Sequence, residues 1–380
     1  MHVLITGGAG FIGSHTADAL IAQGHRVRLL DNLQPTVHPK GKPGYLHPEA
    51  EFMHGDVRDA EAWRKALEGI DAVYHLAAYQ DYLTDFSTYF SVNVVSTALL
   101  YEILVAEPLR FKVAKVVVAA SQAVMGEGRY RCESCSSAEG PYHYPDIRLE
   151  AQLSQGQWDH LCPACGRALQ WLASDEQVIR PCNQYALSKH GQEQIAIQLG
   201  RRYQIPSVAM RYSIVQGPRQ SFYNAYSGAM RIFALCLLFD RAPLIYEDGL
   251  QVRDFVNIDD VVAANLTVLA HSGADYQVFN VGGGQAWTVA QFYETMQEVT
   301  GKRLAPQMSG LYRYGDTRHI FSDTTRLQAL GWRAQRPVQE SITAYWHYLT
   351  GQEEQRDILE YAERQMRRLN VIRQSGKQYP

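Results

Sequence analysis

The chain has 380 residues, of which 46% are hydrophobic and 20% are charged, and its formal net charge is −3. This composition is typical of a soluble globular protein with room for more than one lobe. The small negative charge gives no global attraction to nucleic acid or to an anionic membrane, so a phosphate-bearing ligand must be bound by local groups. The longest apolar run, Ile232 to Phe239, is too short to span a bilayer. No leader precedes the first strand-like run, and we expect a cytoplasmic protein without membrane or nucleic-acid partners.

Short apolar strands alternate with helices through the first half of the chain. This alternation predicts an α/β fold with a Rossmann-type doubly wound parallel sheet. We expect a cofactor-binding domain over 1–204, with an insertion at 129–181 that is rich in Cys, Gly, Pro and polar residues. A smaller substrate lobe is expected over 205–380, with segments that return to the first domain. Strands are predicted at 3–5, 26–30, 72–76 and 115–120, and helices at 12–23, 60–68, 92–107, 183–203 and 353–370.

A glycine-rich loop joins the first predicted strand to the first predicted helix. Its glycines, Gly7, Gly10 and Gly13, have the G-x-x-G-x-x-G spacing. One permits a tight turn, one lets the backbone approach a pyrophosphate, and one lets the helix pack against the sheet. The free N–H groups of the helix N-terminus then face the phosphates. The position between a strand and a helix favours a dinucleotide site over a glycine-rich turn without a ligand.

Asp31 ends the second strand, 18 residues after Gly13. A carboxylate at this place accepts hydrogen bonds from ribose hydroxyls and repels a 2′-phosphate, which favours NAD over NADP. Asp56 follows the next strand. Its carboxylate is a candidate contact for the adenine amine, and the alternative is an N-cap for the helix that follows.

Tyr185 and Lys189 lie four residues apart, which places them on one face of a helix. An ammonium beside a phenol lowers the pKa of the tyrosine and prepares it to accept a proton. Ser121 ends an earlier strand and can hydrogen-bond the same substrate oxygen. These three residues are the predicted catalytic set, and the alternative is a Tyr/Lys pair on a surface helix.

Together these motifs resemble the extended short-chain dehydrogenase/reductase family, which includes NAD-dependent nucleotide-sugar epimerases and dehydratases. The resemblance extends nearly from end to end. It implies that Asn93 supports the active-site helix and that Arg219 and Arg253 neutralise a sugar-nucleotide diphosphate. The implied cofactor contacts are Gly7, Gly10, Phe11, Ile12, Gly13, Asp31, Asn32, Asp56, Val57, Leu76, Ala77, Ala78, Asn93, Tyr185 and Lys189. The implied substrate contacts are Gln122, Arg219, Asn224, Arg253 and Arg318.

The sequence departs from the family at positions that bear on the reaction. Dehydratases carry an acid pair directly after the catalytic serine or threonine, where this chain has Gln122 and Ala123. Neither side chain transfers a proton at neutral pH, so elimination of water is disfavoured. Ile214 stands where the family usually has Asn, which leaves the sugar undetermined. We therefore expect a C4 epimerase that works through a 4-keto sugar. A 4-dehydrogenase or reductase, a dehydratase and a non-enzymatic NAD-binding scaffold are the alternatives.

Two Cys-x-x-Cys pairs lie in the insertion, Cys132/Cys135 and Cys162/Cys165. Four thiolates at such spacing suit a tetrahedral structural zinc ion, as in a zinc ribbon. Reduced thiols without metal and disulfides are the alternatives. The insertion is expected to emerge near the mouth of the active site, and Cys182 and Cys236 are expected to be buried. In this insertion the chain resembles the dTDP-L-rhamnose 4-epimerases.

Two long helices, predicted at 92–107 and 183–203, have wide apolar stripes. The family resemblance implies an intermolecular four-helix bundle at these places, so we expect a homodimer. The alternative is that both stripes are buried within one chain.

Overall fold

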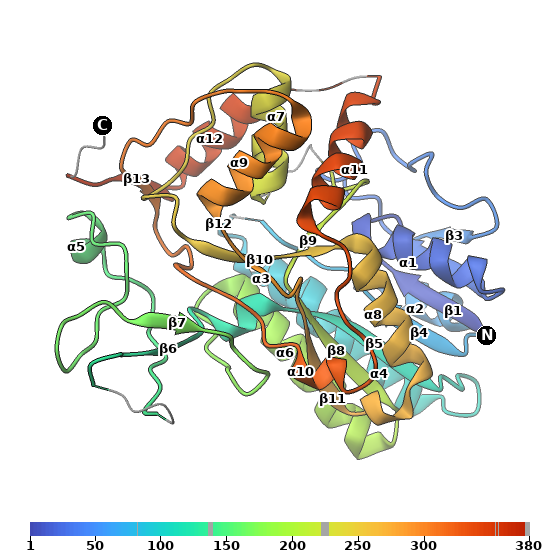
Figure 1. Ribbon diagram of the computed structural model, residues 1–380. Coiled ribbons are helices and arrows are strands. Elements are labelled where there is room, and N and C mark those ends of the chain that lie inside the picture. The colour runs from blue at the N-terminus through green and yellow to red at the C-terminus, as the bar shows by residue number, and fades with distance from the viewer. Residues whose placement is uncertain (82, 136–139, 222–227, 354, 356, 377–380) are drawn as a thin grey trace.

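The structure is a computed structural model that describes residues 1–81, 83–135, 140–221, 228–353, 355 and 357–376. Its centre is a seven-stranded sheet in the order β11-β8-β5-β4-β1-β2-β3, in which every neighbouring pair is parallel (Figure 1). The predicted doubly wound α/β fold is confirmed. The strands are β1 (His2–Thr6), β2 (Arg26–Asp31), β3 (Glu51–His54), β4 (Ala72–His75), β5 (Lys115–Ser121), β8 (Ser207–Tyr212) and β11 (Gln277–Val281).

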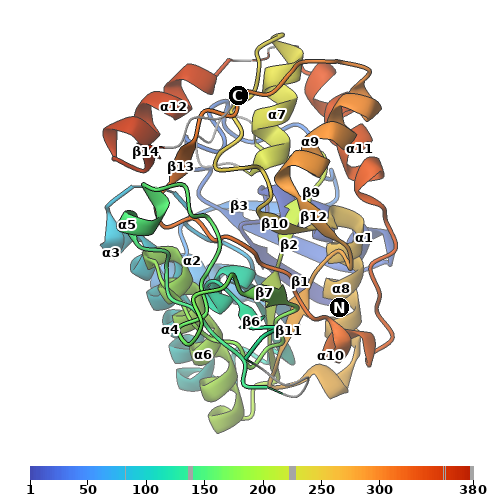
Figure 2. The same cartoon turned by 60° about the vertical axis from the view of Figure 1, so that its left-hand side comes forward.

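Helices cover both faces of this sheet, and successive strand residues pack into opposite layers (Figure 2). Val3 and Ile5 of β1 face a core that includes Ala17 and Val261, whereas Leu4 faces a core that includes Trp63 and Leu100. Strands covered on both faces are apolar throughout, which explains their continuous hydrophobic runs. The covering helices are α1 (Phe11–Ala22) and α8 (Ile258–Ala270) on one face, and α2 (Ala60–Leu67), α4 (Ser96–Ala106) and α6 (Gln184–Tyr203) on the other.

The order of the strands places a crevice above the sheet. The chain winds outward from β1 through β2 to β3 and then returns to β4 on the other side of β1. In doubly wound sheets, ligands bind at the carboxyl ends of the strands where the order reverses. The loops after β1, β4 and β5 therefore determine the site.

Residues after β8 build a second lobe. Its small sheet has the order β12-β10-β9, with β9 (Ile214–Gln216), β10 (Val252–Asn257) and β12 (Ala286–Thr288). A separate apolar core, which includes Phe233, Phe255 and Tyr345, lies among its helices. These helices are α7 (Ala229–Leu238), α9 (Val289–Thr300), α11 (Val338–Thr350) and α12 (Leu359–Arg368), and smaller elements are α10 (Thr325–Gln328), the 3-10 turn η3 (Ser272–Ala274) and the pair β13 (Leu311–Arg313) and β14 (Ile372–Gln374). Helix α12 is shorter than the helix predicted over 353–370.

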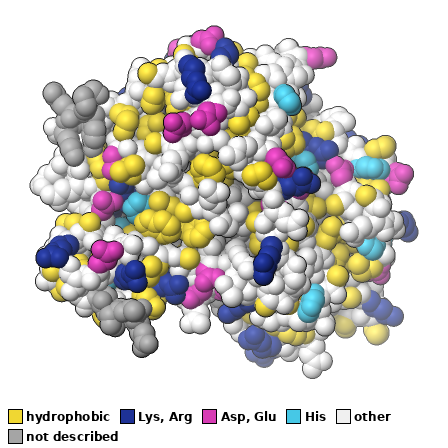
Figure 3. Space-filling view, in the orientation of Figure 1, with side chains coloured by type: hydrophobic (Ala, Val, Ile, Leu, Met, Phe, Trp, Pro, Cys, Tyr) yellow, Lys and Arg dark blue, Asp and Glu magenta, His cyan; other side chains and the backbone are white. Residues whose placement is uncertain are grey.

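The insertion projects from one end of the molecule and has little regular structure (Figure 1). It contains the antiparallel pair β6 (Arg129–Arg131) and β7 (Gln170–Leu172) and the short helix α5 (Glu150–Leu153). Acidic and basic side chains are interspersed on the face shown in Figure 3, in keeping with the small net charge.

The helix predicted over 92–107 begins earlier than expected, at Phe86. It comprises α3 (Phe86–Tyr89), a π-helical segment η1 (Phe90–Val95) and α4. Taken together, these 21 residues are long and apolar enough to cross a membrane by length and composition. No unbroken apolar run of this length exists, as expected, but this stretch reaches it with polar residues among the apolar ones. In the structure 44% of its most apolar window is buried, and Asn93, Ser96 and Thr97 lie on the buried side. It has the properties of a core helix with one exposed face.

Candidate active site

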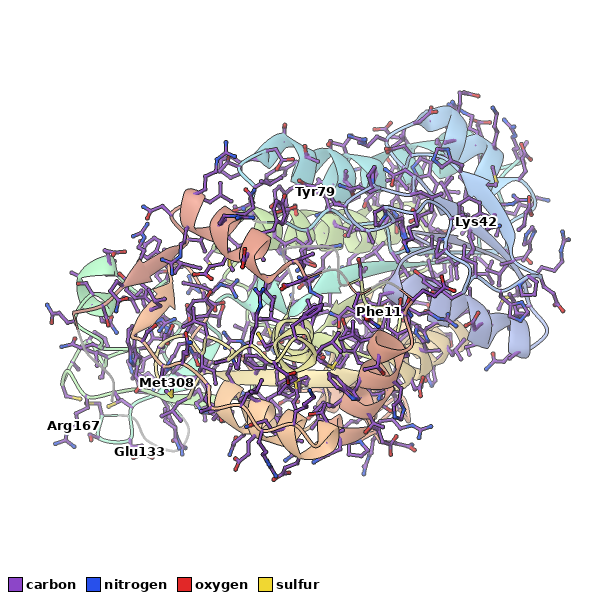
Figure 4. The ribbon with its side chains drawn as sticks, turned by 90° about the horizontal axis from the view of Figure 1, so that it is seen from above. Phe11, Lys42, Tyr79, Glu133, Arg167 and Met308 are labelled. Atoms are coloured by element: carbon purple, nitrogen blue, oxygen red, sulfur yellow. The ribbon has the colours of Figure 1, made fainter. Side chains whose placement is uncertain are left out.

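A cavity of about 1330 Å³ lies at the carboxyl ends of the central strands, between the two lobes. The glycine loop, the end of β5 and the start of α6 line one side, and residues of α7, β10 and the segment after β13 line the other. Phe11, Tyr79 and Lys42, which all line this cavity, are labelled in Figure 4. The predicted residues Gly7, Gly10, Phe11, Ile12, Gly13, Leu76, Ala78, Ser121, Gln122, Tyr185, Lys189, Arg219 and Arg253 all line it.

The glycine loop is shaped to let a ligand approach its backbone. Gly7 has φ of +65°, and a Cβ there would lie 2.8 Å from the backbone of Ala77. A Cβ at Gly13 would lie 2.3 Å from the Gly7 carbonyl oxygen, so glycine is required for the helix to pack this closely. Gly10 precedes α1 and provides no side-chain cap for the N–H groups of its first turn. These groups suit a pyrophosphate, and the residues present fit NAD.

Asp31 lies beside this loop, at the end of β2. Its carboxylate accepts hydrogen bonds from the N–H groups of Ala9 and Leu33, at 3.0 and 2.9 Å. The structure thereby fixes an acidic group next to the pyrophosphate loop. Asp31, Asn32 and Ala77 adjoin the cavity lining without belonging to it.

Asp56 and Val57 also lie outside the cavity lining. Hydrogen bonds from Arg58 are the main reason that the pKa of Asp56 falls to about 2, and Asn32 donates a further bond. The carboxylate that caps α2 belongs to Asp59, which accepts the N–H of Glu61. The N-cap alternative for Asp56 was therefore wrong. Val57 is buried beside Trp63 in the core.

The predicted catalytic residues meet at the cavity from two elements. Ser121 is the last residue of β5, and its Oγ accepts the N–H of Ala123 in the 3-10 turn η2 (Gln122–Met125). Tyr185 lies in the first turn of α6, which Asn183 caps by accepting the Ala186 N–H at 2.8 Å. The two residues are 64 positions apart in the sequence, and both line the same cavity.

Lys189 lies about one turn after Tyr185 in α6 and is buried. Its Nζ donates to the Ala119 carbonyl at 2.7 Å and to Oε1 of Gln192 at 2.8 Å. Burial lowers the pKa of Lys189 to about 7, because desolvation disfavours the charged form. The ammonium is therefore close to its titration point at neutral pH.

A pH dependence of stability follows from this shift. Between the folded pKa of about 7 and the ordinary value of 10.5, the unfolded chain holds a proton on Lys189 that the folded protein lacks. Rising pH should therefore stabilise the ligand-free fold through this group, by at most about 1.4 kcal/mol per pH unit. Thermal melts of wild type and Lys189→Met from pH 7 to 10 measure the contribution. We expect the wild-type melting temperature to increase relative to the variant as pH rises, and parallel curves would contradict the burial argument.

Asn93 supports the catalytic helix and does not line the cavity. It is fully buried, with its Oδ1 accepting the Tyr79 N–H at 2.8 Å. Its Nδ2 donates to the Tyr79 carbonyl and to Ser188 Oγ, and Ser188 in turn donates to the Tyr185 carbonyl. The supporting role implied by the family resemblance matches these contacts. Its inclusion among cofactor contacts was wrong, because its amide is engaged within the protein.

Two arginines that sequence analysis missed also line the cavity, Arg231 and Arg313. Arg231 is 1% exposed in α7, and burial lowers its pKa to about 10. Its Nη1 donates to the Ser221 carbonyl, while its Nε and Nη2 have no hydrogen-bond partner among the described residues. A buried cation with unpaired donors is costly, so this wall of the cavity favours an anionic ligand. A single arginine within an apolar helix was the available sequence signal.

Arg318 was predicted to contact the substrate, and the structure contradicts this prediction. Its guanidinium lies outside the cavity lining and is 1% exposed. It pairs with the carboxylates of Asp159, Glu247 and Asp248 at 2.7–3.0 Å. These contacts engage its N–H donors within the protein, so it is no substrate contact. Asn224, the other weaker candidate, lies outside the described residues.

The four insertion cysteines gather at one place. Their sulfur atoms all lie within 4.8 Å of one another, and Cys132 and Cys165 are 3.6 Å apart. That separation excludes a disulfide between these two and approaches the roughly 3.8 Å between ligands of a tetrahedral zinc ion. Backbone N–H groups of Ala164 and Cys165 lower the pKa of the Cys162 thiol to about 7. Cys236 is buried as expected, whereas Cys182 is exposed, so that expectation was wrong for Cys182.

Comparison with known proteins shows the family of this chain. The model of the NAD-dependent epimerase/dehydratase family matches residues 3–146 and 166–282. The chain belongs to this family. It is 33% identical over 90% of its length to dTDP-L-rhamnose 4-epimerase from Burkholderia thailandensis, of which it covers 92%. It is also 29% identical over 90% of its length to a putative UDP-glucose 4-epimerase from Methanocaldococcus jannaschii, of which it covers 95%.

Solved structures of this family share the fold. UDP-glucose 4-epimerase from Thermotoga maritima, solved with UDP-glucose, has a TM-score of 0.74 and 27% identity, with 92% of this chain and 99% of that chain covered. The Thermus thermophilus UDP-glucose 4-epimerase in complex with NAD has a TM-score of 0.71 at the same identity and coverage. The family match has a gap at 147–165, within the insertion of this epimerase/dehydratase family member.

Proposed function

We propose that the protein is an NAD-dependent 4-epimerase of a nucleotide-diphosphate sugar. The observation that carries the proposal is one cavity with Ser121, Tyr185 and Lys189 on its floor, a pyrophosphate loop on one side and arginines on the other. Relatives named dTDP-L-rhamnose 4-epimerase and UDP-glucose 4-epimerase support the same substrate class and the same carbon. A neighbour solved with NAD and another solved with UDP-glucose support the two ligands.

The residues divide the chemistry between them. Tyr185 accepts the proton of the sugar 4-hydroxyl, while Ser121 hydrogen-bonds the same oxygen. Lys189 holds positive charge below the phenol and favours its ionised form. NAD, held along the loop of Gly7, Gly10 and Gly13, would supply the hydride acceptor and donor that this reaction needs. Arg253 and Arg219 hold the diphosphate while the sugar turns within the cavity.

The side chains after Ser121 disfavour elimination of water. Gln122 lines the cavity, and its amide cannot act as an acid or base at neutral pH. Ala123 has no proton to transfer. Epimerisation needs only one proton acceptor, so the described set suffices for it. A dehydrogenase would use the same residues but would consume one equivalent of external NAD per turnover.

The proposal is tested by incubating the purified protein with a panel of UDP- and dTDP-sugars, without added NAD. Anomeric proton NMR resolves the two epimers. We expect one nucleotide sugar to reach an equilibrium mixture of C4 epimers. Accumulation of an oxidised sugar, or of a dehydrated product, would assign the protein to one of the alternative reactions.

Replacement of Asp31 by Ala or Asn should weaken NAD binding and narrow the preference over NADP, because either change removes the charge that repels a 2′-phosphate. The Asn variant keeps an oxygen that can accept the Ala9 N–H, so it separates the loss of charge from the loss of loop structure. Calorimetry with both dinucleotides measures the effect. Unchanged affinity for NAD in both variants would remove Asp31 from the cofactor site.

We propose that Cys132, Cys135, Cys162 and Cys165 bind one structural zinc ion in a reducing, cytoplasmic environment. The described residues of the insertion form small apolar clusters, one with Tyr130, Cys132, Cys162 and Leu169 and another with Leu153 and Trp158. Zinc–thiolate bonds supply the stability that such a segment lacks. Four sulfur ligands leave no open position, so this ion takes no part in catalysis.

We propose a homodimer that joins through the outer faces of the α3–η1–α4 stretch and α6. Phe86, Phe90, Val95 and Leu187 expose between 39% and 56% of their surface there. Val95→Asp should shift the protein from twice the 42.9 kDa chain mass toward the monomer in light scattering. Leu109→Asp is the matched control, because Leu109 is 89% exposed beyond these helices. A wild-type monomer at micromolar concentration would contradict the dimer.

A further inference from the structure

A buried ionic network joins the insertion to the second lobe. At its centre is Glu247, whose carboxylate pairs with Arg148 of the insertion and with Arg318 of the segment after β13. Arg148 contacts both oxygens of Glu247 at 2.8 Å, and both side chains are at most 2% exposed. A bidentate arginine–carboxylate pair of this kind fixes the relative orientation of the two side chains as well as the distance between them.

Arg148 also reaches the cavity wall directly. It donates to the backbone carbonyl of Asp316 at 2.8 Å. Asp316 lies within the run 313–317, and every residue of this run lines the cavity. The carboxylate of Asp316 is 3.4 Å from the guanidinium of Arg253, and Arg253 also donates to the Arg318 carbonyl at 3.2 Å. Arg148 therefore hydrogen-bonds the segment 313–318, and Asp316 and Arg318 of this segment contact Arg253.

A second contact from the insertion reaches the same segment. Asp159 accepts from Arg318 at 2.8 Å and lies 3.4 Å from His319. No described residue of 129–181 lines the cavity itself. The insertion, which was expected to emerge near the mouth of the active site, contacts the cavity only through residues that line it or lie next to its lining. Figure 4 shows Glu133 and Arg167 of the insertion far from Phe11 and Lys42. The contacts of Arg148 and Asp159 give the insertion an indirect path to the residues that line the cavity.

We propose that Arg148 is a positioning residue through which the insertion holds Arg253 and Asp316 in their binding geometry. The insertion thereby sets the affinity for the diphosphate of the nucleotide sugar and leaves NAD binding unaffected. This inference rests on the proposed function, because it assigns Arg253 to the diphosphate. It gives the cysteine-bearing insertion a role in substrate binding although none of its described residues lines the cavity.

Arg148→Met is the first test variant. Glu247 keeps its contact with Arg318 at 3.0 Å, so the substitution leaves no unpaired buried carboxylate and the fold should persist. Calorimetry of UDP and dTDP binding to the NAD-loaded protein measures the diphosphate site without turnover. We expect affinity to fall by a factor on the order of 10, since misplaced binding groups cost this much or more. NAD content should stay unchanged, and Arg148→Lys should recover part of the loss.

Arg167→Met is the matched control within the same insertion. Arg167 is exposed, its guanidinium donates to Ser134, and it does not line the cavity, so its replacement should leave affinity unchanged. Asp159→Asn provides a second variant at a half-exposed position, should Arg148→Met fail to fold. It should weaken diphosphate binding in the same direction.

A double-mutant cycle with Arg253→Ala decides whether Arg148 acts through Arg253. We expect Arg148→Met to have little further effect in the Arg253→Ala background, because residues that act as one unit are not additive. Full additivity, or unchanged affinity in Arg148→Met, would overturn the proposal. So would parallel loss of NAD, which indicates general damage. If the wild-type protein binds UDP or dTDP yet epimerises no nucleotide sugar, the proposed function fails while this coupling stands. If it binds neither nucleotide, the same variants are compared with inorganic pyrophosphate.

Discussion

Replacing Tyr185 by Phe is expected to reduce turnover by a factor of about 100 or more, the usual scale for loss of a general acid/base. The variant removes only the phenolic oxygen, so the first turn of α6 and its Asn183 cap should persist. NAD content and affinity for UDP or dTDP should remain close to those of the wild type. Turnover measured by NMR under saturating substrate separates the chemical step from binding.

The outcome for Tyr185→Phe distinguishes its role from that of its neighbours. Ser121→Ala should cost less, because Lys189 and Tyr185 remain in place and only a hydrogen bond to the substrate oxygen is lost. Near wild-type activity in Tyr185→Phe would remove this residue from the mechanism. A loss of NAD together with activity would indicate a defect in the cofactor site.

The second large effect is expected from Cys162→Ser. Cys162 is buried in the small core of the insertion, and its loss should release the proposed zinc and loosen residues 129–181. Metal affinity is folding free energy for such a segment, so the remaining three sulfurs should not hold it. We expect about one equivalent of zinc per wild-type chain and less than about a tenth in the variant, with reduced affinity for the diphosphate.

Cys182→Ser is the matched control for this experiment, because Cys182 is exposed and lies outside the cluster. It should keep both zinc and activity. Elemental analysis of freshly purified protein under reducing conditions gives the metal content. A wild-type protein without transition metal and with all four thiols reactive would contradict the zinc proposal.

The parts of the site that follow from local spacing could be predicted from sequence. The glycine loop requires three glycines at fixed intervals, because a Cβ at Gly7 or Gly13 would collide with backbone atoms. Tyr185 and Lys189 are placed by one helical turn. The Cys-x-x-Cys pairs likewise set their own geometry through tight turns, such as the one in which the Gly166 N–H bonds the Cys162 carbonyl.

The parts of the site that depend on tertiary contacts could not be predicted from the sequence. Arg313 ends the short strand β13 and Arg318 lies in the irregular segment after it, and only the fold shows that Arg313 lines the cavity. Arg318 instead forms ion pairs with Asp159 and Asp248, which come from distant parts of the chain. The pairing of Arg148 with Glu247 joins residues 99 positions apart, and no local pattern indicates it.

The apolar helices illustrate the same limit. Arg231 directly precedes the apolar run Ile232 to Phe239, and the sequence does not show that this arginine is buried in the same helix. The start of the 86–106 stretch was missed, although Asp85 precedes it, because polar residues such as Ser91 and Asn93 interrupt its apolar residues.

The central claim is that the protein inverts a sugar carbon by removing a hydrogen and returning the same hydrogen to it. The most direct measurement is epimerisation in D2O without added NAD, with the product analysed by NMR and mass spectrometry. The account predicts that the inverted carbon carries no solvent deuterium and that the amount of oxidised cofactor in the protein is unchanged after many turnovers. Deuterium at that carbon, or a reaction that stops after one equivalent of NAD, would contradict it.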